Sequence, residues 1–188
     1  PGDVAPAGPG PRICGDCRKQ DWPFVLARAG GPYEGILKEV LHRFKYAGRR
    51  SLAPHLAFMM AEAFRAEPFF CKVGIDLALP VPLSGEKLRQ AALLAREVGI
   101  LLQITTDKRT LVKNFETPPQ AGLTRSARQS NLAGAFSVRY PDRIRGRNIL
   151  IIDDVFTTGS TLSAVAAITR QAGANQVFGL TAAAVRLF

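Results

Sequence analysis

The fold of this chain is decided by the stretch Ile149-Leu150-Ile151-Ile152-Asp153-Asp154-Val155-Phe156-Thr157-Thr158-Gly159-Ser160-Thr161. Its first four residues are apolar, which is typical of a strand buried on both faces in a parallel sheet. Two acidic residues follow at the carboxyl end of that strand, where open α/β sheets bind ligands. A loop of hydroxyl side chains and one glycine then opens a helix, which we expect to run to Ala172 and to end at Gly173.

This order of residues predicts a binding site for a sugar phosphate. The backbone N–H groups of the loop, its hydroxyl side chains and the dipole of the helix all favour a phosphate group. The neighbouring carboxylates of Asp153 and Asp154 can hold the hydroxyls of a ribose. Each part alone is weak evidence, because the loop could be an ordinary N-capped helix start and the acidic pair a solvated turn. Their combination in this order favours the binding site.

The rest of the chain alternates between helical and strand-like patterns, which predicts an α/β domain with a parallel sheet flanked by helices. Apolar residues recur at helical spacing in three segments and form short apolar runs in three others. The expected helices are 33–44, 52–64 and 91–102, and the expected strands beside 149–152 are 75–80, 111–112 and 177–183.

Composition limits the kind of partner and the compartment. The 188 residues include 25 Lys and Arg against 15 Asp and Glu, a net charge of +10. This excess favours polyanionic partners such as nucleic acid, phosphorylated metabolites or acidic membrane surfaces, although a solvated arginine-rich face gives the same count. No apolar run approaches the roughly 18 residues of a membrane span, so we expect a soluble, cytoplasmic protein.

The three cysteines do not suggest a disulfide framework, because their number is odd and no secretory leader precedes them. Cys14 and Cys17 form a CxxC pair in a segment rich in proline and glycine, which on its own could be a redox pair or part of a metal site. Cys71 follows two phenylalanines, which predicts a buried, inert thiol. We therefore expect a flexible N-terminus over 1–32 with a partial cysteine knuckle, and one domain over 33–188.

The segment from Asp153 to Thr161 resembles the signature of type I phosphoribosyltransferases. That resemblance implies that Asp153 and Asp154 contact the ribose hydroxyls of phosphoribosyl pyrophosphate (PRPP) as the catalytic acidic pair. It implies that the 5′-phosphate lies on the loop Thr157–Thr161 and that Val155 belongs to the same site. In such enzymes Mg²⁺ arrives bound to the ribose and pyrophosphate of PRPP and keeps most of its waters.

Two more segments match this resemblance and extend the expected PRPP site. A turn at Pro82, Leu83 and Ser84 follows the strand 75–80, where these enzymes place a pyrophosphate loop. The basic segment 113–132 takes the place of the mobile loop that closes over PRPP. In it, Lys113, Arg125 and Arg128 would meet the charge of the pyrophosphate; a solvated basic loop is the alternative.

The chain as a whole is similar to the competence-protein ComF/GntX family. The resemblance covers nearly the whole chain, and the stretch 117–136 also resembles the PRPP-binding domain of amidophosphoribosyltransferases. The matching motifs are Tyr33-Glu34-Gly35, Phe44-Lys45-Tyr46, Ser51-Leu52-Ala53-Pro54, Val81-Pro82-Leu83, Gln90-Ala91, Leu93-Leu94-Ala95, Thr117-Pro118-Pro119-Gln120-Ala121-Gly122-Leu123, Asn131-Leu132 and Ala135-Phe136.

Two departures from this family stand out. Leu83 to Gln90 is several residues too short and lacks the usual Gly-Phe-Asn. Either this protein has lost part of the pyrophosphate loop, or the printed sequence lacks residues of a mobile segment; we favour the second, because the rest of the site is intact. Relatives also carry two CxxC pairs that form a zinc knuckle. Since the sequence starts at Pro1, we expect the first pair upstream, so that Cys14 and Cys17 are half of a Zn²⁺ site.

The family resemblance leaves two functions open. The first is an enzyme, a pentosyltransferase that transfers the phosphoribosyl group with Mg²⁺-dependent release of pyrophosphate, linked to competence and DNA uptake. Its acceptor specificity would lie in a hood formed by the two N-terminal helices. The second is a non-catalytic accessory that uses the same fold to bind single-stranded DNA or nucleotides, alone or with competence proteins. Fold alone does not decide between them.

Overall fold

A computed structural model describes residues 21–83, 85–115, 132 and 134–185 of the chain. The described helices and strands are β1 (Leu26–Ala29), α2 (Gly35–Tyr46), η1 (Arg50–Leu52), α3 (Ala53–Arg65), α4 (Pro68–Val73), β2 (Leu77–Pro80), α5 (Gly85–Leu102), β3 (Leu111–Lys113), β4 (Phe136–Val138), η2 (Pro141–Arg143), β5 (Asn148–Phe156), α7 (Ser160–Gln171) and β6 (Gln176–Ala184).

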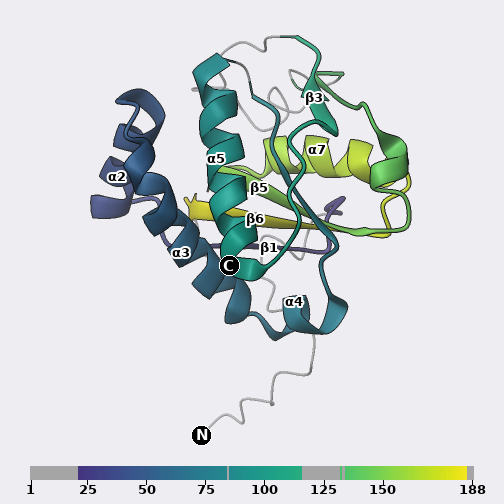
Figure 1. Cartoon of the computed structure of the whole chain (residues 1–188), viewed down its shortest axis with the longest axis horizontal. Helices are drawn as coiled ribbons and strands as arrows, with labels where there is room; N and C mark the ends of the chain where they lie inside the picture. Colours follow the sequence, from purple (N-terminus) through teal and green to yellow (C-terminus); the bar gives the residue numbers. More distant parts are fainter. Residues whose placement is uncertain (1–20, 84, 116–131, 133, 186–188) are drawn as a thin grey trace, which may run out of the picture.

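Four strands form a parallel sheet in the order β1-β6-β5-β2, with β5 and β6 at its centre (Figure 1). The predicted α/β architecture with a parallel sheet is confirmed. The edge strand β1 was not predicted. It lies inside the segment expected to be a flexible N-terminus, so the sheet begins before residue 33.

Helices cover both faces of the sheet because successive residues of β5 point to opposite sides. Ile149 and Ile151 pack with α7, whereas Leu150 and Ile152 pack with the helices α2, α3 and α5. All four side chains are fully buried. Each contributes about 1.5–3 kcal/mol to stability by leaving water. The apolar run that decided the fold is therefore the centre of a three-layer α/β/α domain.

The chain after α5 runs along the outer edge of β2. The N–H of Ala78 donates to the carbonyl of Thr105 at 2.9 Å, and the N–H of Asp107 donates to the carbonyl of Ala78 at 3.0 Å. The predicted strand at 111–112 exists as β3, but it pairs antiparallel with β4 in a separate two-stranded sheet.

Three predictions about local structure need correction. Cys71 is exposed, because the short helix α4 turns Phe70 into the core and Cys71 toward solvent. Helix α5 begins at Gly85, earlier than the expected residue 91. Strand β5 continues through the acidic pair to Phe156. No helix within the described ranges combines the length and apolar character that crossing a membrane requires.

Candidate functional site

The acidic pair, Asp153 and Asp154, lies near the carboxyl end of strand β5. Asp153 is opposite Thr181 of β6, and both carboxylates are half-buried. The N–H of Asp154 donates to Oδ1 of Asp153 at 2.9 Å. Pairing of Asp153 with β6 and this hydrogen bond hold the acidic pair at the end of the strand.

Lys45 of α2 supplies a positive charge to this pair. Its Nζ lies 2.8 Å from Oδ2 of Asp154, and their side chains are 25% and 18% exposed. This residue was not among the predicted site residues. The sequence carried one signal, the motif Phe44-Lys45-Tyr46, but nothing in it indicates that the end of α2 reaches the end of β5.

The pKa values of Asp153 and Lys45 differ from their ordinary values. Burial raises the pKa of Asp153 to about 7, the charge of Asp154 adds to this effect, and Lys45 opposes it. Burial lowers the pKa of Lys45, but the attraction of Asp154 outweighs it, so that pKa is raised overall. Near neutral pH, Asp153 therefore exists in both protonation states and can donate or accept a hydrogen bond toward a hydroxyl.

The predicted phosphate loop depends on Gly159, which precedes the first residue of α7. Its φ of +75° lies in the left-handed region that favours glycine. A Cβ at this position would lie 2.7 Å from ring carbons of both Trp22 and Phe156. The aromatic rings of Trp22, Phe24 and Phe156 pack together with centroid distances of 5.0–6.4 Å. The loop thus rests on an aromatic platform that only glycine fits.

Hydroxyl groups surround the start of α7. Oγ1 of Thr158 and Oγ of Ser160 are 2.8 Å apart, and the N–H of Ser160 donates to Oγ1 of Thr158 at 3.4 Å. Exposed N–H groups and hydroxyls at a helix start suit a phosphate. The cavity in the loop, bordered by Asp153 and Thr181, is only about 10 Å³, roughly one water molecule. This cavity is therefore too small to hold a phosphate group.

The other predicted residues fall in different places. Pro82 is buried and Leu83 packs against the core on the α7 face, so only their backbone can reach a ligand. The N–H of Val81 donates to the carbonyl of Ile152 at 2.9 Å, which joins this turn to the strand that carries the acidic pair. Lys113 ends β3 on the separate hairpin.

The remaining predicted site residues lie outside the described residues. They are Cys14, Cys17, Ser84, Arg125 and Arg128. Of the predicted site, the structure therefore brings together the segment 153–161 and the turn at 81–83 beside it.

Competence protein F of Haemophilus influenzae is 30% identical to this chain over 182 residues, a match that covers 90% of this chain and 78% of that protein. The chain belongs to the competence protein F family. DNA utilization protein YhgH of Salmonella typhi is 28% identical to this chain over 182 residues. That match covers 92% of this chain and 78% of YhgH. No protein-family model matches the chain.

Solved structures agree on the fold. The glutamine PRPP amidotransferase of B. subtilis superposes on 76% of this chain, with a TM-score of 0.52 and 18% sequence identity. The chain spans 30% of that structure's length. The predicted α/β fold with a parallel sheet is therefore confirmed, and it resembles the fold of this PRPP-dependent enzyme. The N-terminal hood and the zinc-knuckle remnant stay predictions.

Proposed function

We propose that this protein binds PRPP at the end of β5 and transfers its phosphoribosyl group in a process linked to competence. The observation that carries the proposal is the fixed acidic pair, Asp153 and Asp154, directly before a glycine-shaped, hydroxyl-rich helix start. One group suits a ribose diol and the other suits a phosphate. The two are covalently joined in a 5′-phosphoribosyl compound.

Lys45 gives the acidic pair a second role in this proposal. Its ion pair with Asp154 stabilises the carboxylate until a ribose hydroxyl replaces the lysine or donates beside it. Asp153, with a pKa raised to about 7, accepts a hydrogen bond from the other hydroxyl when it is ionised. The pair thus orients the ribose and favours positive charge that develops at C1.

In the proposed reaction, the phosphoribosyl group passes from pyrophosphate to the acceptor. The C1–O bond to pyrophosphate breaks, the electron pair leaves with the pyrophosphate, and a lone pair of the acceptor forms the new bond to C1. The proton of the acceptor passes to solvent. We expect the buried turn at Pro82 and Leu83 to contribute its backbone to pyrophosphate binding, and Ser84, Lys113, Arg125 and Arg128 to contribute side chains.

Magnesium would enter with PRPP. Carboxylate oxygens are suitable Mg²⁺ ligands, and Asp153 and Asp154 are the candidates at this site. Among the described residues, no three His, Cys, Asp or Glu side chains gather closely enough to hold a metal by themselves. When bound, the metal would neutralise charge on the leaving pyrophosphate.

Calorimetry with PRPP and Mg²⁺ tests this proposal. Asp154→Asn removes a charge-assisted hydrogen bond to ribose and should weaken binding about 10- to 100-fold, or 1.5–3 kcal/mol. Asp142→Asn is the matched control, because Asp142 is 88% exposed in an ion pair with Arg145. No heat with the folded wild-type protein would refute PRPP binding.

A non-catalytic accessory for single-stranded DNA or nucleotides is the second candidate. It is supported by the net charge of +10 and by the name of the relative YhgH, a DNA utilization protein. Binding of a labelled oligonucleotide should fall steeply as salt rises. Competition by PRPP would place the oligonucleotide on the phosphate loop, and independence from PRPP would place it on a separate basic surface.

Further parts of the proposal concern the N-terminal half. Helices α2 and α3 serve as the hood that selects the acceptor, and the end of α2 already contacts the acidic pair through Lys45. Cys14 and Cys17 supply two thiolate ligands to a structural Zn²⁺ site. We propose that the protein acts in the cytoplasm, with competence proteins as partners.

A further inference from the structure

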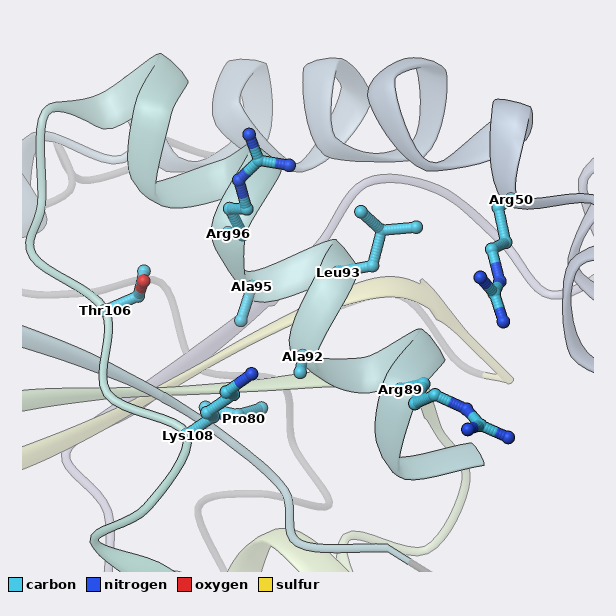
Figure 2. A pocket seen from close by; sticks show the side chains of 9 residues that line it. All are labelled: Arg50, Pro80, Arg89, Ala92, Leu93, Ala95, Arg96, Thr106 and Lys108. Atoms are coloured by element: carbon cyan, nitrogen blue, oxygen red, sulfur yellow. The ribbon is translucent and has the colours of Figure 1, made fainter. Parts of the chain in front are cut away.

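A second cavity lies along α5 and is separate from the phosphate loop. Its volume is about 440 Å³, and it shares no lining residue with the cavity of that loop. Figure 2 shows the residues that line it, which come from η1, β2, α5 and the segment after α5. They are Arg50, Pro80, Arg89, Ala92, Leu93, Ala95, Arg96, Thr106 and Lys108.

One face of α5 forms the floor of this pocket. Arg89, Ala92, Leu93 and Arg96 are spaced i, i+3, i+4 and i+7, so they lie on one side of the helix (Figure 2). The backbone positions of the two arginines are about 10 Å apart along the axis. An apolar strip with small side chains therefore separates two guanidinium groups.

The opposite wall is held close to α5 by the fold. Thr106 and Lys108 belong to the segment that runs along the edge of β2. A Cβ on Gly99 of α5 would lie 2.4 Å from Cγ2 of Thr106, so only glycine permits this approach. The wall is thus part of the packed domain.

The pocket concentrates positive charge. Four cationic side chains line it, and none of the described lining residues is acidic. Arg96 is 67% exposed and forms a solvent-exposed ion pair with Glu97 at 3.5 Å. The adjoining cavity of about 430 Å³ differs, because it contains Asp107, which pairs with Arg143 at 2.6 Å. A cavity lined by four cations attracts a ligand with several negative charges.

The combination of volume, charge and apolar floor indicates the class of ligand. Guanidinium groups bind phosphate through paired hydrogen bonds. An apolar floor between them suits a flat ring rather than water. We propose that this pocket binds a nucleotide with two or more phosphates, its phosphates on the arginines and Lys108, and its base on Ala92, Leu93 and Pro80. This proposal does not depend on PRPP binding.

The position of the pocket connects it to the proposed site. Pro80 is paired with Ile152, one residue before Asp153. The pocket therefore borders the same end of the sheet, one strand away from the acidic pair. A nucleotide bound here lies beside a phosphoribosyl group on the loop without occupying its place.

Fluorescence anisotropy with ADP that carries a fluorescent label on the ribose tests the proposal. Arg96→Ala and Lys108→Ala should each weaken ADP binding about 10-fold, because each removes a charge-assisted contact. Both side chains are exposed, so the variants should fold. Arg170→Ala, an equal loss of charge at the exposed end of α7, is the matched control and should leave ADP binding unchanged. Saturating PRPP with Mg²⁺ should not displace ADP.

Other results would overturn the proposal. The first is no binding at millimolar ADP, and the second is an equal loss of ADP affinity in Arg170→Ala and Arg96→Ala. The third is displacement of ADP by PRPP. The fourth is binding of oligothymidine through Arg96 and Lys108 while ADP does not bind. The first two leave PRPP binding to Asp154 untouched. Calorimetry of Arg96→Ala with PRPP separates the two proposals, because that variant should bind PRPP as the wild type does.

Discussion

The acidic pair at the end of β5 and the basic pocket along α5 differ in how the fold places their charges. Asp153 and Asp154 are half-buried at the end of the central strand β5, and Asp154 forms an ion pair with the partly buried Lys45. The pocket cations Arg89 and Arg96 of α5 and Lys108 of the segment after it are exposed. One site is rigid and shifts pKa values; the other gathers solvated charge at a surface.

This difference indicates that a charged side chain affects folding stability mainly where water is excluded. A half-buried carboxylate changes its pKa and couples stability to pH. An exposed arginine keeps its charge and contributes little to folding, but it remains available to a ligand. Substitutions of the acidic pair should therefore change the free energy of unfolding more than substitutions of the pocket arginines, although each removes one charge.

The largest effect is expected from the backbone of the rigid site. Gly159→Ala forces an alanine into a positive φ and brings a methyl group against the rings of Trp22 and Phe156. Strain and overpacking together should cost about 2–5 kcal/mol. Urea denaturation measures this loss. PRPP binding should fall with it, because the loop cannot keep its shape.

Gly146→Ala is the matched control for this prediction. Gly146 has a similar φ of +71°, but its Cβ would meet nothing within 4 Å. The cost there should be about 1–2 kcal/mol from backbone strain alone. Equal losses at both positions would show that the aromatic platform does not shape the phosphate loop.

The sequence predicted the parts of the molecule that are contiguous in the chain. The apolar run 149–152, the acidic pair and the glycine at the helix start each have a local physical reason, so β5, the loop and α7 were predicted together. Strand β1 was missed because Leu26–Ala29 has four residues and gains its place only by pairing with β6. Cys71 was misjudged because the pattern of two phenylalanines does not say which way the turn of α4 points.

The residues that sequence reasoning missed act across long separations. Lys45 reaches Asp154 only after α2 packs on the sheet, and no local pattern indicates that contact. The basic pocket is assembled from η1, α5 and the edge segment, which are separate in the chain. In the sequence its arginines were indistinguishable from solvated charge.

The pH dependence of stability gives the second largest effect. The pKa of Asp153 is about 7 when folded, above its ordinary value of 3.8, so the folded state binds more protons between those values. The free energy of unfolding therefore decreases as pH rises from about 4 to about 7, by about 2–4 kcal/mol. Asp153→Asn should remove this decrease and be more stable than the wild type above neutral pH.

Urea denaturation across this pH range, compared with Asp142→Asn, isolates the contribution of Asp153. The comparison is needed because Asp107, whose pKa is lowered through bonds to Arg109, Arg143 and Thr110 despite its burial, gives the opposite slope at acid pH. A parallel pH profile for Asp153→Asn and the wild type would mean that Asp153 is ionised at neutral pH like a surface carboxylate.

Lys45→Met tests whether the acidic pair needs a cation from a distant element. Loss of a largely buried ion pair should cost about 1–2 kcal/mol, with methionine filling the space of the lysine stem. Since Lys45 lowers the pKa of Asp153, the variant should raise that pKa further, which carboxyl NMR titration can detect. Lys38→Met, on the exposed side of the same helix, should leave the titration unchanged. An unchanged Asp153 titration in Lys45→Met would contradict the ion pair.

The smallest effect is expected in the basic pocket. Arg96→Ala should change stability by no more than about 0.5 kcal/mol, because its exposed guanidinium makes only a solvent-exposed ion pair with Glu97. Arg65→Ala is the informative partner, since Arg65 lies on α3 and donates to the carbonyl of Leu101 at 2.7 Å and to Glu62 at 2.8 Å. Loss of those bonds should cost about 1 kcal/mol. Of these two exposed arginines, Arg65 would then stabilise the packing of helices, whereas Arg96 would be available to bind a ligand. If Arg96→Ala proved as costly as Arg65→Ala, the pocket cations would be structural, and the contrast between a rigid site and a solvated one would fail.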